Sequence, residues 1–133
     1  MERADMAEEW NLVPKYEGFY EVSNLGAVRS MTRQVPYGRH GHTLYIGRVL
    51  KQFSSKKGYA CVKLSLCGAL RTTYVHELVL RAFVGSRPVT QSRGEIRHLD
   101  GRKTNNTLTN LVYGTVVENA ADRVKHNKIR RAQ

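Results

Sequence analysis

The segment Glu95–Asn127 (EIRHLDGRKTNNTLTNLVYGTVVENAADRVKHN) constrains this chain more than any other. It predicts a short strand ending on His98, a polar loop, a second short strand at Leu111–Tyr113 and a helix that carries Asn119. A side chain at a strand end and another one turn into the following helix both point into the space between hairpin and helix. We expect that space to hold one divalent ion and one phosphate.

The segment resembles the ββα-metal core of HNH endonucleases of the phage and intron-homing type. The family pattern is a strand with His-x-Asp-Gly-x-x-x-Asn-Asn, then Asn-Leu-x-aromatic, then Glu-Asn on a helix. The matching residues are His98, Asp100, Gly101, Asn105, Asn106, Asn110, Leu111, Tyr113, Glu118 and Asn119. Glu8–Met31 is similar to the N-terminal module that precedes the core in the same nucleases, so the two resemblances cover most of the chain.

The resemblance implies a role for each side chain in hydrolysing a phosphodiester. His98 is the expected general base, a task that suits an ordinary imidazole pKa near 6.5. Asn110 is expected to hold either the imidazole or the loop. Asn119 is expected to bind Mg²⁺ or Mn²⁺ through its carbonyl oxygen, a hard ligand suited to either ion. In such nucleases the ion neutralises charge on the phosphoryl group and assists the leaving 3′ oxygen.

The residue before the general base departs from the family pattern. Homing-type nucleases usually have Asp or Asn there as a second metal ligand, whereas this chain has Arg97, which has no acceptor atom. Three interpretations stay open. Asp100 supplies an oxygen directly or through water; Asn119, phosphate and waters hold the ion alone; or Arg97 clamps the scissile phosphate. Positions 98 and 100 share a face if the strand continues, which favours Asp100.

The charge of the chain points to a polyanionic partner. Lys and Arg number 22 against 11 acidic residues, so the net charge is +11 and the pI is about 10.1. Lys and Arg side chains that neutralise phosphates release condensed counterions, so nucleic acid is the expected partner, with a merely soluble basic surface or a ribosome-associated protein as the alternatives. The resemblance to HNH endonucleases implies double-stranded DNA. The candidate nucleic-acid contacts are Arg29, Lys51, Lys56, Lys57, Arg71, His76, Arg97, Lys103 and Arg123.

The order of the patterns predicts an α+β fold. A small antiparallel β-sheet N-terminal lobe, residues 1–70, is expected to contact DNA. The resemblance implies an HNH ββα-metal core with a basic tail over residues 71–133. Within it, apolar residues spaced three and four apart predict a helix over Val75–Phe83.

The N-terminal lobe has its own strand signals. Residues 16–23 and 27–31 are expected to pair through a tight turn, and Arg48–Phe53 is expected to pair with Tyr59–Leu66. Gln34–Gly47, with three glycines and a proline, has no steady period and is expected to be a loop.

Two histidine positions admit more than one interpretation. His40 and His42 flank Gly41, and we favour a solvated loop over a metal site for this pair. His76 matches a Val-His-x-Leu-Val pattern that precedes the catalytic hairpin in homing-type proteins. We favour a structural role there, with the ring bonded to a neighbouring carbonyl.

The remaining features limit the location of the protein. The sequence has no run of eighteen apolar residues and its N-terminus lacks an apolar signal region, so we expect neither membrane insertion nor secretion. Cys61 and Cys67 lie six apart in one expected strand, too far apart for a disulfide. We expect a cytoplasmic protein of a host cell, and the resemblance implies that a phage or prophage encodes it.

The leading hypothesis is a metal-dependent DNA endonuclease. One site per chain predicts strand nicking by a monomer, whereas double-strand breaks would need a dimer or two sequential events. We expect a monomer or weak dimer. The alternative is a DNA- or RNA-binding module whose site is degenerate at Arg97. A ribosome-associated basic protein would not explain His98, Asn110 and Asn119 together.

Overall fold

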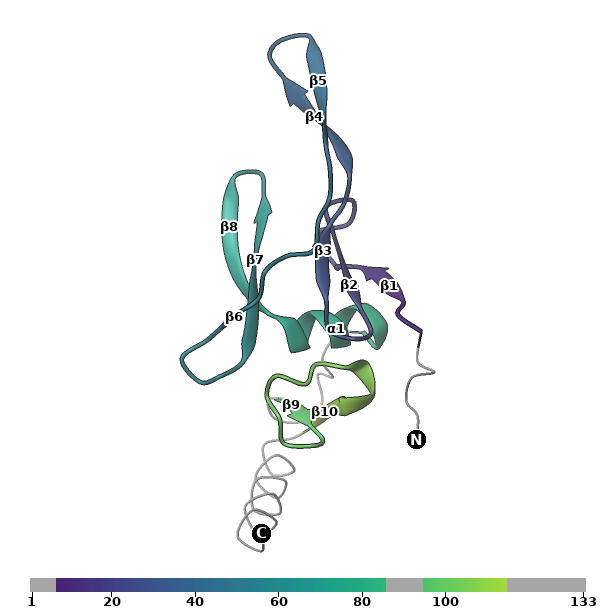
Figure 1. Ribbon diagram of the computed structural model, residues 1–133, viewed down its shortest axis with the longest axis vertical. Helices are drawn as coiled ribbons and strands as arrows, with labels where there is room; N and C mark the ends of the chain where they lie inside the picture. Colours follow the sequence, from purple (N-terminus) through teal and green to yellow (C-terminus); the bar gives the residue numbers. More distant parts are fainter. Residues whose placement is uncertain (1–6, 86–94, 115–133) are drawn as a thin grey trace, which may run out of the picture.

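The computed structural model describes residues 7–85 and 95–114, which form small antiparallel sheets around one helix (Figure 1). The elements are β1 Trp10–Leu12, β2 Tyr20–Ser23, β3 Val28–Ser30, β4 Arg33–Tyr37, β5 Gly41–Tyr45, β6 Phe53–Ser54, β7 Ala60–Leu66, β8 Ala69–Tyr74, α1 Val75–Phe83, β9 Glu95–His98, the 3-10 helix η2 Leu108–Asn110 and β10 Leu111–Gly114. The sheets are β1-β2-β3, β4-β5, β6-β7-β8 and β9-β10. The helix expected after β10 lies outside the described residues.

Helix α1 organises the hydrophobic core. It has the bounds that its apolar period predicts, and it contacts β1, β2, β7, β8, β10 and η2 (Figure 1). Val75 and Val79 are fully buried and Leu78 is 3% exposed. Burying side chains of this size stabilises a fold by about 1.5–3 kcal/mol each. The core joins Val22 of the N-terminal hairpin to Leu111 of β10, and a division near residue 70 stays a prediction.

The N-terminal hairpin is confirmed, although its first strand begins later than expected. Residues Tyr16–Phe19 form a turn, in which the Phe19 N–H donates to the Tyr16 carbonyl at 2.9 Å, and β2 begins at Tyr20. β2 then pairs with β3 through a turn in which Ser23 Oγ accepts bonds from the backbone N–H groups of Leu25 and Ala27.

The loop expected over 34–47 is wrong, because most of this segment forms the antiparallel hairpin β4-β5. Its register runs from Arg33↔Tyr45 to Tyr37↔Gly41, and the hairpin projects from the rest of the fold (Figure 1). Nearly all its side chains are exposed or half-buried, so it needs no alternation of apolar and polar residues to fold. The Arg33 guanidinium lies over both Phe19 and Tyr45, which ties the hairpin to the body.

The strand expected over Arg48–Phe53 is also wrong over most of its length. Only Val49 makes an isolated bridge, to Arg29, and pairing with β7 begins at β6. The expected strand over 59–66 is confirmed as β7, which also pairs with β8. Cys61 and Cys67 are free cysteines, as predicted. No helix in the described ranges is long and apolar enough to cross a membrane.

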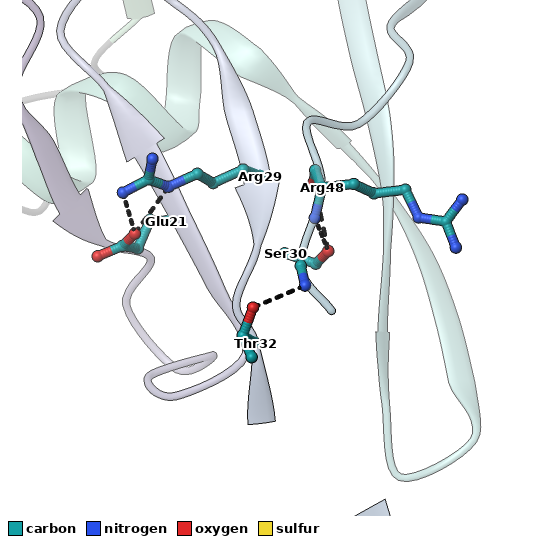
Figure 2. Close-up of polar contacts among 6 residues, drawn as sticks. Glu21, Arg29, Ser30, Thr32 and Arg48 are labelled. Carbon is teal, nitrogen blue, oxygen red and sulfur yellow. Dashed lines mark hydrogen bonds and ion pairs between the residues drawn. The ribbon is translucent and has the colours of Figure 1, made fainter. Parts of the chain in front are cut away.

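A tight crossing joins β3 to the segment after the projecting hairpin (Figure 2). The Arg48 N–H donates to Ser30 Oγ at 3.0 Å, and the Gly47 N–H donates to Thr32 Oγ1 at 2.9 Å. A Cβ on Gly47 would overlap the Ser30 carbonyl oxygen and lie 2.9 Å from the Met31 carbonyl carbon. The crossing therefore excludes a side chain at Gly47.

Gly47→Ala is expected to destabilise the fold by about 2–3 kcal/mol, because backbone atoms must move to admit the methyl group. Gly38→Ala, in the turn of the same hairpin, is the matched control. It has a φ of +69° with nothing within 4 Å of an added Cβ, and should cost only about 1 kcal/mol. Urea denaturation measures both values, and equal costs would refute the proposed clash.

Candidate active site

The hairpin β9-β10 presents His98 at the end of its first strand. Register pairs Leu111↔His98 and Gly114↔Glu95, which confirms both strands that the sequence predicts around the polar loop. The Leu99 N–H donates to the Asn110 carbonyl at 2.8 Å, and the Gly101 N–H donates to the His98 carbonyl at 2.9 Å. The chain therefore turns sharply directly after His98, which sets the direction of the loop.

Asn110 and Asp100 organise the loop between the strands. The Asn110 side chain is buried; its Oδ1 accepts the Asp100 backbone N–H at 2.9 Å. Its Nδ2 donates to Asp100 Oδ1 and to the Asn105 carbonyl, each at 2.9 Å. Of the two roles expected for Asn110, these contacts favour holding the loop over holding the imidazole.

The carboxylate of Asp100 is largely committed to the same loop. Oδ1 accepts from the Arg102 N–H at 2.8 Å as well as from Asn110, and Oδ2 accepts from Asn105 Nδ2 at 2.7 Å. Burial acts to raise the pKa of Asp100, but these hydrogen bonds outweigh it and hold that pKa below its usual value. Two bonds use both lone pairs of Oδ1, so only Oδ2 has capacity left for a further ligand.

The imidazole of His98 is half-buried and bonded to a neighbour that sequence reasoning did not assign. Its Nε2 lies 2.9 Å from Oδ1 of Asn106, a residue that is 5% exposed. Because that oxygen can only accept, Nε2 carries a proton and Nδ1 keeps its lone pair. The signal for Asn106 was present in the Asn-Asn pair of the motif.

Burial lowers the pKa of His98. The Asn106 hydrogen bond and the Asp100 charge act to raise it, and the Lys103 charge acts to lower it, leaving the pKa below the ordinary value of 6.5. The ring is therefore neutral at pH 7, the state that a general base requires.

The β2–β3 turn packs closely against Asn106. A Cβ on Gly26 would lie 3.1 Å from the Asn106 carbonyl oxygen, and the Gly26 φ of +93° also favours glycine. The Leu108 N–H donates to the Asn24 carbonyl at 2.8 Å, and the Asn24 side-chain Oδ1 accepts from the Glu9 N–H at 2.8 Å. The N-terminal hairpin thus packs against Asn106, the hydrogen-bond partner of His98.

Two predicted nucleic-acid contacts lie beside the imidazole. His76 is 8% exposed, and its ring centroid is 5.2 Å from that of His98, so it faces the interior at the start of α1. Lys103 Nζ donates to the Lys57 carbonyl at 2.8 Å and lies 5.0 Å from the ring centroid of Tyr59. Both side chains therefore contribute to the surroundings of His98.

The other predicted contacts are dispersed. Arg29 is held by Glu21, with an N–O distance of 2.8 Å (Figure 2). Its guanidinium lies 3.9 Å from the ring centroid of Trp10. Arg97 lies half-buried on β9, opposite Val112. The residues with exposed side chains are Lys51, Lys56, Lys57 and Arg71. Asn119 and Arg123 lie outside the described residues.

The described residues do not by themselves build a metal centre. No group of three or more His, Cys, Asp or Glu side chains gathers within residues 7–85 and 95–114. Arg97 offers no acceptor atom, and Asp100 retains capacity on one oxygen only. A complete ligand set therefore needs residues beyond these ranges or the substrate itself.

Comparisons with known proteins agree with this geometry. Residues 8–65 match the NUMOD4 motif. The chain is 34% identical over 107 residues to DNA endonuclease I-HmuI of Bacillus phage SP01, covering 80% of this chain and 52% of that protein. It is 31% identical over 115 residues to the uncharacterized HNH endonuclease L245 of Acanthamoeba polyphaga mimivirus, covering 86% of this chain and 29% of that protein.

The chain also matches a solved structure of I-HmuI, an HNH homing endonuclease that binds and cleaves DNA. The TM-score is 0.67 and the sequence identity is 31%. The match covers 90% of this chain and 59% of that one. The chain is a relative of the homing-type HNH endonucleases. The resemblance predicted from both ends of the sequence is confirmed, and the chain spans about half or less of the length of the curated HNH relatives.

Lys103→Met is expected to raise the pKa of His98, because it removes a nearby positive charge and keeps most of the stem. Asn106→Ala should move the same pKa downward, since it removes a hydrogen bond that favours the protonated ring. NMR titration of the His98 ring measures both shifts. Lys63→Met, at an exposed position on β7, is the control without effect. Shifts of the same sign in both test variants would refute the assignment.

Proposed function

We propose that this chain carries a metal-dependent HNH DNA endonuclease that hydrolyses phosphodiester bonds and nicks one strand. The observation that supports it most is the half-buried, neutral imidazole of His98, bonded through Nε2 to Asn106 at the end of a ββ hairpin. Relatives named as endonucleases agree with that chemistry. The enzyme is encoded by a phage or another mobile element and acts in the cytoplasm of the host cell.

His98 is the general base of the reaction. Its Nδ1 lone pair takes a proton from the attacking water, and the imidazolium that forms keeps its Nε2–H bonded to Asn106 Oδ1. A fixed acceptor on the far nitrogen holds the tautomer and the ring direction through the cycle. Asn110 and Asp100 act indirectly, by keeping the loop that carries Asn106 in one conformation.

A divalent ion, Mg²⁺ or Mn²⁺, neutralises charge on the phosphoryl group and on the leaving 3′ oxygen when bound. Asn119 is the protein ligand that we propose for it, with the remaining oxygen capacity of Asp100 available directly or through water. Because loop contacts already occupy most of the Asp100 carboxylate, substrate phosphate and waters would supply most of the other ligands. Arg97 then meets the scissile phosphate, which its planar guanidinium fits.

Double-stranded DNA is the proposed substrate. Lys51, Lys56, Lys57 and Arg71 have exposed side chains suited to backbone phosphates. The projecting hairpin adds Arg39, exposed near its tip, which sequence reasoning did not single out. With one site per chain, a monomer cuts one strand at a time.

The alternative function is a DNA- or RNA-binding module with a degenerate site. Arg97, in place of an acidic or amide ligand, favours it, because losing a metal ligand weakens catalysis before it weakens phosphate binding. Both functions predict nucleic-acid binding, so cleavage is the property that separates them.

The wild-type protein is expected to convert supercoiled plasmid to the nicked form with Mg²⁺ or Mn²⁺, and EDTA should abolish the reaction. His98→Ala should lower the rate by about 10²–10⁴-fold, the range for a lost general base, while the DNA dissociation constant stays within about threefold. His42→Ala, in the exposed strand β5, is the matched control. Binding without nicking under every metal would support the binding module instead.

Affinity for DNA is expected to fall steeply between about 50 and 200 mM salt, since bound phosphates release counterions. Replacing Lys56 and Lys57 together by Gln should flatten the slope of log affinity against log salt by about two, one for each lost contact. Filter binding or anisotropy on duplexes of unrelated sequence measures this. An unchanged slope would remove the β6–β7 turn from the DNA interface.

A further inference from the structure

Tyr59 stands at the centre of a cluster of rings next to the general base. Its ring centroid lies 6.0 Å from His98, 5.1 Å from His76 and 5.8 Å from Tyr74. His76 in turn stacks on Tyr74 at 5.2 Å and meets His98 edge-on at 5.2 Å. Tyr59 thus contacts rings from the end of β8, the start of α1 and the end of β9.

The backbone of Tyr59 is rigidly held. It directly precedes β7, and its carbonyl accepts the Ser55 N–H at 2.8 Å across the β6–β7 turn. The Tyr59 N–H donates to Ser55 Oγ at 3.2 Å. A ring on such an anchored backbone has little freedom to follow movements of its neighbours.

Lys103 closes the arrangement from the loop that follows His98. Its ammonium lies 5.0 Å from the Tyr59 ring centroid, a distance at which a cation is attracted to an aromatic face. The same ammonium donates to the Lys57 carbonyl in the β6–β7 turn. Lys103 therefore joins the β6–β7 turn to the loop after His98, beside the Tyr59 ring.

We propose that Tyr59 is a positioning residue for His98. Its ring fixes the plane of the imidazole, while Asn106 accepts the hydrogen bond from Nε2. The inference rests on the proposed role of His98 as general base. It assigns a catalytic task to the segment that matches the NUMOD4 motif, because Tyr59 lies within residues 8–65.

Other groups also face the imidazole and must be considered with Tyr59. His76 approaches it from α1, and the charged Asp100 and Lys103 approach from the loop. The Tyr59 ring adds no charge in its neutral state, so it acts through shape and exclusion of water. The aromatic face, which Phe retains, is the part of the side chain that the inference requires.

The experiment compares Tyr59→Ala with Tyr59→Phe in the full chain. Tyr59→Ala is expected to lower the single-turnover nicking rate at least tenfold, with the DNA dissociation constant within threefold of wild type. It should also raise the pKa of His98 toward its ordinary value in an NMR titration without DNA or metal, because water reaches the ring. Tyr59→Phe should match wild type within threefold in rate and leave the titration unchanged.

Phe53→Ala is the matched control, since it removes an aromatic ring from neighbouring β6, where Phe53 packs against Lys63. It should leave the titration of His98 unchanged. Tyr59→Leu replaces the alanine variant if that variant unfolds, because Leu keeps apolar bulk without an aromatic face. Damage by Tyr59→Phe equal to that by Tyr59→Ala would overturn the inference in favour of the hydroxyl.

The titration separates this inference from the proposed function. If wild type fails to nick DNA under any metal, the endonuclease proposal fails, and the His98 titration still tests the positioning by Tyr59. If wild type nicks DNA and the alanine and leucine variants change neither the rate nor the titration, the positioning inference fails alone.

Discussion

The hydrogen bond between His98 Nε2 and Asn106 Oδ1 is the interaction on which the rest of the site depends. It leaves the lone pair on Nδ1, and the half-buried surroundings keep the ring neutral. Its geometry in turn requires a loop with a single conformation. Asp100 and Asn110 provide that conformation by satisfying each other and the backbone around them.

Two other parts of the chain pack against this loop. The β2–β3 turn packs against Asn106: a Cβ at position 26 would lie 3.1 Å from the Asn106 carbonyl oxygen, and the φ of +93° there also favours glycine. The β6–β7 turn contacts the loop through Lys103, whose ammonium donates to the Lys57 carbonyl and lies near the Tyr59 ring. Helix α1 connects these two parts, since its buried face packs on strands from both halves of the chain.

Local patterns predicted the elements whose residues interact with near neighbours. The helix over Val75–Phe83 followed from its apolar period, and the strands beside His98 followed from the motif. The hairpin β4-β5 was missed because neither of its faces is buried, so no alternation marks it. The motif contained Asn106 but did not show that its side chain bonds the His98 ring. The contact between Tyr59 and His98 was missed because it joins segments far apart in the sequence. Asn119 lies outside the described residues, so its role stays a prediction.

The close approach of Gly26 to the backbone of Asn106 also bears on how such proteins diversify. An N-terminal module that only bound DNA could be exchanged between nucleases as an independent unit. In this chain, a side chain at position 26 would press on Asn106, which bonds the imidazole of His98. A replacement hairpin would therefore have to keep glycine at this contact to leave the partner of His98 in place.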